Sequence, residues 1–185
     1  MSVSPGGYTS QPVSVYVCCG WRTGDADKTY ELNGETARLR SIDDPLPAGA
    51  KLTAYYQGKI LSETYATRGV PSAAGTGALL PRGDGLELVP SVNPNELFAG
   101  EMLPLKALVD GKTATDVLVD IYLAARQAEG SEPTLRLQSD KDGVINFVPP
   151  QAGIYVLRAR HNVASASASV PEVRYTYTLV LEATK

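Results

Sequence analysis

The fold is decided by residues 153–157, which read Gly-Ile-Tyr-Val-Leu and begin a strand that runs to His161. Further strands lie on both sides of this segment. Apolar or alternating runs bounded by turn residues predict them at Leu86–Pro90, Met102–Val109, Asp116–Ala124, Thr134–Ser139, Val144–Val148, Ile154–His161 and Val173–Ala183. Tight-turn signals separate several of them, at Asp110-Gly111-Lys112 and Asp140–Gly143. The second half of the chain is therefore predicted to consist of short strands.

The last strand indicates how the sheet is exposed. One face is apolar (Val173, Tyr175, Tyr177, Leu179, Leu181) and the other is polar (Arg174, Thr176, Thr178, Glu182). Such a strand faces a core on one side and water on the other. Seven strands without a convincing helical period, one of them opening on Gly-x-Tyr, are typical of immunoglobulin-like sandwiches. We therefore predict an all-β fold in which residues 85–185 form an immunoglobulin-like Greek-key β-sandwich.

The first half is predicted to be a smaller β-rich region, residues 1–84. Residues 1–12 are rich in Ser, Gly and Pro and are predicted to be a loose N-terminal segment. Alternation predicts a strand at Val13–Cys19, a loop at Gly20–Asp25, and strands at Thr36–Ile42, Lys51–Tyr56 and Lys59–Ala66, the last two joined as a hairpin across Gln57-Gly58. Thr67–Asp84 has no period and is predicted to be a long loop. This region is expected to pack on the sandwich or to complete its sheets.

Composition limits the classes of partner. The 185 residues carry a net charge of −3, and the halves are alike, with eight basic and nine acidic side chains in residues 1–90 and nine and eleven in the rest. The absence of a basic stripe argues against nucleic acid and anionic membranes. No apolar run reaches the roughly 20 residues of a membrane span. The first residues lack the features of a signal peptide, so the chain is either cytosolic or a mature region with an added Met.

Motifs for catalysis are missing. The single histidine excludes a His-Glu-x-x-His zinc helix, and no Gly-x-Ser-x-Gly elbow is present. Asp140-x-Asp142-Gly143 resembles the start of a calcium loop. A strand follows it, so we predict a turn in which aspartate side chains cap backbone amides. We therefore expect no enzyme activity.

Three residues are candidates for binding. His161 and Cys18 could ligate a metal ion, because imidazole and thiolate suit divalent transition metals. The structural alternative for His161 is a hydrogen-bonded histidine at the rim of the core. Cys19 lies on the apolar face of its strand and is predicted to be a small buried hydrophobe, whereas Cys18 lies with Ser14 and Tyr16 and could be exposed. Adjacent Cys18 and Cys19 point to opposite faces of a strand, which argues against a disulfide between them. Trp21 could contact a ligand or partner, or could cover the end of the sandwich.

The strands also resemble one family. Gly85–Pro90, Asn93-Pro94, Leu97–Leu105, Ser139–Gly143 and the segment from Pro149 to His161 are similar to a bacterial exported family of unknown function that is also labelled a nickel-uptake substrate-specific component. The resemblance is clear over residues 85–161 and weaker over residues 12–44. It implies a periplasmic or otherwise extracytoplasmic sandwich, nickel or cobalt as the metal, and a membrane transporter as a partner. His161 matches the family pattern, whereas Trp21 stands where members place a histidine.

The sequence thus predicts a non-catalytic exported binding or accessory module, associated through the resemblance with nickel or cobalt uptake. The alternative is a structural or adhesive sandwich that contacts other proteins through sheet edges or loop tips. Both hypotheses expect protein partners.

Overall fold

A computed structural model describes residues 15–41, 43–67, 77, 79–124, 132–166 and 170–185, and for residues 15–25 and 67 it describes only the backbone. The described strands are β1 (Val15–Leu32), β2 (Glu35–Arg38), β3 (Lys51–Thr67), β4 (Leu86–Pro90), β5 (Leu103–Val109), β6 (Lys112–Thr113), β7 (Leu118–Leu123), β8 (Leu135–Gln138), β9 (Val144–Phe147), β10 (Gly153–Ala164) and β11 (Glu172–Ala183). A short 3-10 helix, η2 (Pro94–Glu96), follows β4. The predicted all-β fold is confirmed.

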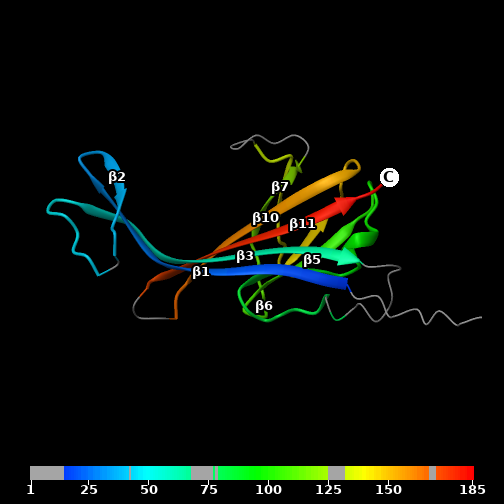
Figure 1. The fold of residues 1–185 in the computed structure, drawn as a ribbon, viewed down its shortest axis with the longest axis horizontal. Helices are drawn as coiled ribbons and strands as arrows, with labels where there is room; N and C mark the ends of the chain where they lie inside the picture. The colour runs from blue at the N-terminus through cyan, green and yellow to red at the C-terminus, as the bar shows by residue number, and fades with distance from the viewer. Residues whose placement is uncertain (1–14, 42, 68–76, 78, 125–131, 167–169) are drawn as a thin grey trace, which may run out of the picture.

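Two sheets form a sandwich. The larger sheet has the strand order β2-β1-β3-β11-β10-β7-β8, and the smaller one has β4-β5-β6 with β9 paired to β5 (Figure 1). Strands β4, β5 and β9 therefore face β11, β10, β7 and β8, which is the division of strands in an immunoglobulin-like domain. All seven strands predicted after residue 85 are present, with small differences at their ends. The turn at Asp110-Gly111 has φ angles of 49° and 75° and closes a two-residue hairpin between β5 and β6.

Tyr155 explains why the Gly-x-Tyr segment marks this fold. Its side chain is fully buried, and its hydroxyl donates a hydrogen bond to the Gln151 carbonyl at 2.7 Å. Its ring meets the edge of Phe147 from the facing sheet, with centroids 5.3 Å apart. A tyrosine that bonds back to the chain just upstream of its strand is the tyrosine corner of immunoglobulin-like domains. This contact joins the two layers at one end of the core.

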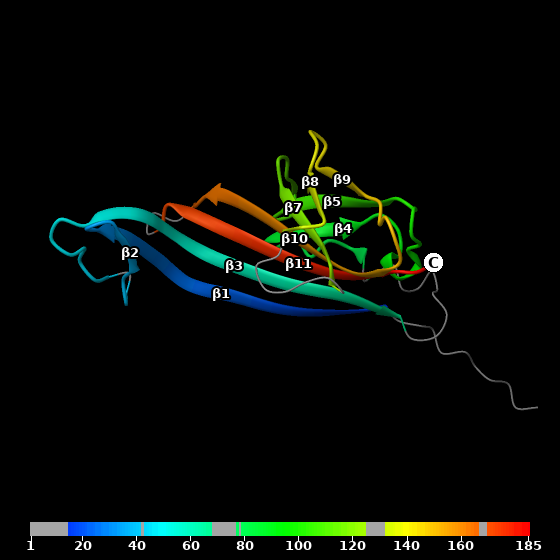
Figure 2. The ribbon, with the colours of Figure 1, turned by 90° about the horizontal axis from the view of Figure 1, so that it is seen from above.

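The N-terminal strands complete the larger sheet. β3 pairs with β11 in parallel, from Gln57 opposite Val173 to Thr64 opposite Val180. β1 pairs with β3 in antiparallel fashion along most of its length. The predicted region 1–84 is thus continuous with the sandwich through its sheet. β1 and β3 extend well past the smaller sheet, and β2 lies at their far end (Figure 2).

Two predictions in this half are wrong. Gly20–Asp25 was expected to be a loop, but the segment continues β1, with Trp21 opposite Leu61. The register shifts between Thr23 and Ala26, so Gly24 and Asp25 form a bulge within the strand. Gln57-Gly58 does not form a hairpin turn either. It lies inside the continuous β3, because this position is paired with β1 on one side and β11 on the other.

Other predictions in this half fall partly outside the described residues. These are the loose N-terminal segment at 1–12, the first residues of the Val13–Cys19 strand, and residues 68–76 and 78 of the long loop. The strand expected at Thr36–Ile42 is the shorter β2.

The turn between β8 and β9 tolerates only glycine at position 143. Gly143 has a φ of 71°, and a Cβ there would lie 2.7 Å from Thr113 Cγ2 and 3.1 Å from the Ala114 carbonyl oxygen. We expect Gly143→Ala to lower the free energy of unfolding by about 2–3 kcal/mol, because backbone strain adds to a steric clash. Gly100→Ala is the matched control, since Gly100 has a φ of 85° with no atom within 4 Å of the added Cβ. Urea denaturation should show a loss of only about 1 kcal/mol there. Equal losses would contradict the clash.

Candidate functional site

The three predicted binding residues lie on two strands of the larger sheet. In β1, Trp21 pairs with Leu61 and Cys18 pairs with Thr64. His161 lies in β10 opposite Tyr175 and is half-buried. Both strands belong to one sheet, but β3 and β11 separate them.

The register does not bring Cys18 and His161 together. The row of paired residues that contains Cys18 crosses β3 at Thr64, β11 at Val180 and β10 at Val156. His161 lies further along β10 than Val156 by about 17 Å, and β10 is about 14 Å from β1 across the sheet. The two backbones are therefore roughly 20 Å apart, beyond the reach of one shared ion at about 2.0–2.3 Å from each ligand. Among the residues that the structure describes, no group of three or more His, Cys, Asp or Glu side chains could hold a metal ion. A role for either residue alone stays a prediction.

His161 belongs to a polar end of the sandwich. The neighbouring Tyr175 hydroxyl donates to Asp110 Oδ2 at 3.1 Å, and Lys59 Nζ lies 5.6 Å from the centre of its ring. Burial and the charge of Asp110 raise the pKa of Tyr175 to about 12. Asp110 also accepts a hydrogen bond from the Gly85 amide at 2.8 Å. These contacts hold β11 against the turn after β5, so Asp110 has a structural role.

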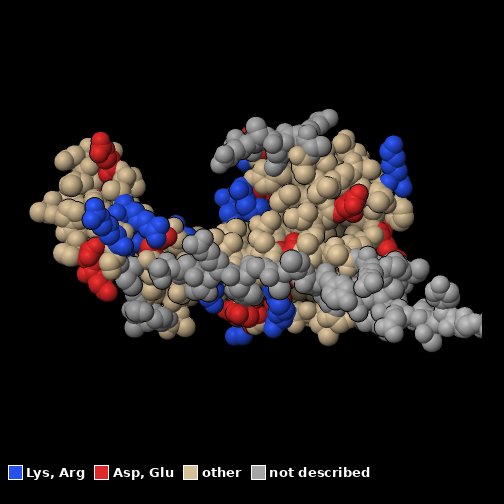
Figure 3. Space-filling model, in the orientation of Figure 1, with Lys and Arg blue, Asp and Glu red and all other residues tan. Residues whose placement is uncertain are grey.

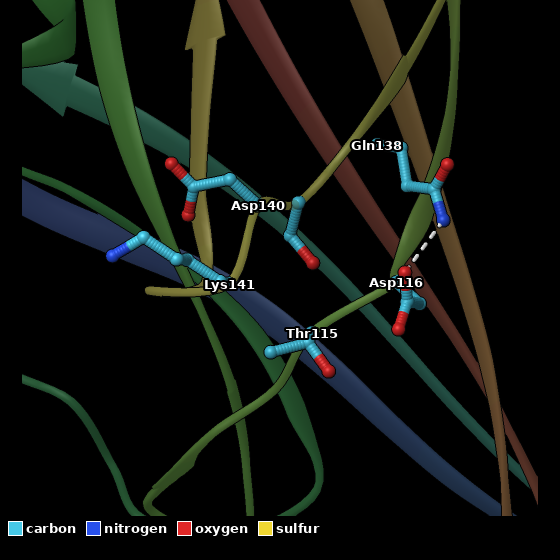
Figure 4. A pocket seen from close by; sticks show the side chains of 6 residues that line it. Thr115, Asp116, Gln138, Asp140 and Lys141 are labelled. Atoms are coloured by element: carbon cyan, nitrogen blue, oxygen red, sulfur yellow. Dashed lines mark hydrogen bonds between the residues drawn. The ribbon is translucent and has the colours of Figure 1, made fainter.

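A shallow depression of about 470 Å³ opens near the ends of β7 and β8. Its lining residues are Thr115, Asp116, Gln138, Ser139, Asp140 and Lys141 (Figure 4). Gln138 donates to Asp116 Oδ1 at 3.0 Å across it. Ser139 binds the backbone, accepting from the Val117 amide and donating to the Ala114 carbonyl. None of these lining residues is a histidine or cysteine, and several of their polar groups are already bonded.

Asp140 on the rim of the depression confirms the predicted turn. Its Oδ1 accepts hydrogen bonds from the Asp142 amide at 2.9 Å and the Val144 amide at 2.8 Å. The Asp142 carboxylate lies beside Lys141 at 2.8 Å. Asp140 therefore shapes the turn that leads into β9.

A polar cluster lies between the sheets: Glu63, Glu87 and Tyr177 are buried, and the more exposed Arg82 pairs with the two glutamates at its edge. The Arg82 guanidinium pairs with Glu63 and lies 3.7 Å from Glu87, while the Tyr177 hydroxyl bonds to Glu63. Glu87 also accepts the amides of Arg82 and Gly83, each at 2.8 Å. Burial, followed by the charge of Glu63, raises the pKa of Tyr177 well above its usual value. Every charge in the cluster has a partner, so the cluster holds β3, β11 and the segment before β4 together.

The larger sheet projects beyond the sandwich (Figure 2). We call residues 26–60 the arm. None of its described residues is buried. Cross-strand contacts stiffen it: Lys28 Nζ lies 4.7 Å from the Tyr55 ring centre, and Thr29 Oγ1 lies 3.1 Å from Thr53 Oγ1. Arg174 of β11 stacks 3.9 Å from the centre of Tyr56 and braces the base of the arm.

The chain is thus an immunoglobulin-like β-sandwich protein with a sheet that projects beyond its core. It belongs to a family described as a domain of unknown function (DUF4198), whose model matches residues 8–163. The family assignment that the strands suggested is therefore confirmed, and the nickel-uptake label remains a prediction. The chain matches none of the curated proteins and none of the solved structures with which it was compared. The described residues include no helix with the length and apolar character of a membrane span.

Sequence reasoning missed the arm, although one signal for it was present. Asn33-Gly34 has φ angles of 55° and 83° and forms the two-residue turn between β1 and β2. Asn-Gly is the strongest short hairpin signal, and it would have placed a hairpin at the arm's end.

The Asp140 turn predicts a pH dependence of stability. The hydrogen bond from Val144 does most to lower the Asp140 pKa below its usual 3.8. A lowered folded-state pKa gives stabilisation that is present above the unfolded-state pKa and is lost as pH falls through the folded-state pKa. Asp140→Asn keeps an acceptor oxygen without the charge, so its melting temperature should lie below the parent's near neutral pH and converge with it in acid. Thermal unfolding across this range measures the effect. Asp142→Asn is the control, and an equal response in both variants would contradict the assignment.

Proposed function

We propose that this protein is a non-catalytic, extracytoplasmic binding module that uses its arm to contact a second protein. The observation that carries the proposal is the lack of any buried residue among the described residues of the arm. Exposed strands cost conformational entropy and bury little apolar surface in return. Such an element adds little to the stability of the fold, so its retention suits a surface that contacts other molecules.

The composition of the arm suits a protein partner. Its sequence carries five acidic and five basic side chains, so it is electrically balanced. Figure 3 shows the two charge types mixed on this projection. Tyr30, Tyr55 and Tyr56 lie on it, together with the exposed Leu46 and Leu52. Tyrosine is enriched at protein interfaces, and balanced charge does not favour a polyanion. A groove on a partner protein that receives the arm fits these properties.

The length of the arm also supports this function. β3 meets β11 first at Gln57, so Lys51–Tyr56 extend beyond that pairing by about 20 Å at 3.3 Å per residue. A projection of this length can enter a partner without moving the sandwich. This is the sheet-edge and loop-tip contact of the structural or adhesive hypothesis.

Site-specific photo-crosslinking in cells tests the arm. A photoreactive amino acid at Leu52 should give a discrete cross-linked species with another protein, identified by mass spectrometry. The matched control is the same amino acid at Met102, another exposed apolar residue that lies on the sandwich. Equal cross-linking at both positions, or none at Leu52, would overturn the proposal.

Shortening the arm should leave the sandwich intact. Replacing residues 32–50 by Asn-Gly joins Glu31 to Lys51, which are already paired across the two strands. Because no described residue in this stretch is buried, we expect the free energy of unfolding to change by less than about 1 kcal/mol. Chemical denaturation measures it. A loss of several kcal/mol would show that the arm serves the fold instead of a partner.

The nickel or cobalt role stays a prediction that rests on the family resemblance. Since the register keeps Cys18 and His161 apart, we expect His161→Ala and Cys18→Ser to bind nickel, cobalt and zinc as the parent chain does. Isothermal titration of the reduced protein measures this. Saturable, stoichiometric binding by the parent chain that is lost in each of the two variants would instead support a metal site shared by Cys18 and His161.

A further inference from the structure

The outer face of the larger sheet holds three arginines around one carboxylate. Asp120 of β7 pairs with Arg158 of β10 on one side and with Arg136 of β8 on the other. Arg160 follows two residues after Arg158 and shares its face. The alternate residues of these strands, such as Ile121 and Leu157, are buried in the core. The charged side chains therefore point away from the smaller sheet.

Asp120 orients the three guanidinium groups. It is only 6% exposed. Its Oδ1 accepts from Arg136 Nε at 3.3 Å, and its Oδ2 lies 3.4 Å from Arg158 Nη2 and in contact with Arg160 Nη2. Arg158 also bonds to the Tyr122 hydroxyl and lies over its ring at 5.1 Å. The buried carboxylate thus fixes a set of cations that would otherwise repel one another.

The cluster has an excess of positive charge within an acidic protein. Asp120 neutralises one of the three arginines, and Glu132 pairs with Arg136 at 2.9 Å while itself being 87% exposed. The side chains of Arg136, Arg158 and Arg160 are 67%, 42% and 53% exposed. Each guanidinium has five N–H donors, and the contacts with described residues use only a few of them. Figure 3 shows a group of Lys and Arg atoms over this part of the sandwich.

The neighbouring surface offers hydroxyl and apolar groups. Thr176 and Thr178 of β11 lie opposite Arg160 and Arg158. Leu118 lies opposite Arg160 on the other side and is exposed. This face exposes the three arginines and Leu118. It suits an extended ligand whose anionic groups receive paired guanidinium bonds and whose hydroxyls meet threonines.

We propose that Arg136, Arg158 and Arg160 form a binding site for a carboxylate-bearing polysaccharide. Planar guanidinium groups bind carboxylates with two parallel hydrogen bonds, which gives both affinity and orientation. A single small anion on an open face competes poorly with water, whereas a polymer gains affinity by presenting repeated groups. The site lies on the sandwich, so it is independent of the arm and would persist if the arm had no partner.

Isothermal titration of the full chain with sodium polygalacturonate tests the site. We expect saturable binding that weakens with added salt and falls about tenfold in Arg160→Gln, since one charged hydrogen-bond donor is lost. Arg174→Gln is the matched control. Arg174 lies on the same sheet, and its guanidinium is engaged by Glu172 and by the ring of Tyr56, so its loss should leave the affinity nearly unchanged. Circular dichroism confirms that both variants remain folded.

Three results would overturn the proposal. No saturable binding of polygalacturonate excludes the ligand class. Equal weakening in Arg160→Gln and Arg174→Gln shows a general effect of net charge. Stronger binding to phosphatidylglycerol vesicles than to the polymer, also lost in Arg160→Gln, assigns the site to a membrane surface instead.

Discussion

The parallel pairing of β3 with β11 is the constraint on which the rest of the structure depends. It joins residues far apart in the chain, so that Thr64 Oγ1 bonds to the Val180 carbonyl across 116 positions of sequence. Parallel pairing requires a long crossover, and here most of the sandwich lies between the two strands. The pairing makes one sheet out of both halves of the chain. It also sets the direction of the arm, since β3 continues beyond the start of β11 with only β1 beside it.

The polar cluster of Glu63, Arg82, Glu87 and Tyr177 reinforces this pairing at a cost, because its two glutamates are buried. Glu63 on β3 and Tyr177 on β11 meet between the sheets, and Arg82 bridges Glu63 to Glu87. Buried charges lose hydration, and the attraction between partners offsets that loss only when the geometry is complete. A shift of β3 by one residue would turn Glu63 to the other face and leave Arg82 and Tyr177 without it. The cluster therefore penalises wrong registers, and so fixes where the arm leaves the sandwich.

The sequence predicted the strands of the second half correctly but mispredicted two segments of the first half. The difference arises because local contacts decide the strands of the second half, whereas distant contacts decide those of the first. Each strand after residue 85 is bounded by its own turn, and Tyr155 bonds only four residues upstream, so local patterns carry the information. The sequence predicted a loop around Gly24 and a turn at Gly58 because glycine is common in loops and turns. In the structure Gly24 belongs to a bulge and Gly58 lies inside a three-strand pairing, and only distant partners decide this. The alternation of apolar and polar residues predicts the sheet face on which Cys18 and His161 each lie, but it carries no information on how many strands lie between them.

The arginine cluster was invisible in the sequence for the same reason. Arg136, Arg158 and Arg160 are ordinary solvated residues until the sheet register places two of them opposite Asp120. Both surfaces with proposed roles arise from this register: one is a continuation of the sheet beyond its core, and the other is a patch on its outer face. The depression near Asp140 differs from these two surfaces, because its side chains form hydrogen bonds that stabilise the turns around it. In this fold the inner face of the larger sheet supplies stability, which leaves its outer face and its extension free to take on binding.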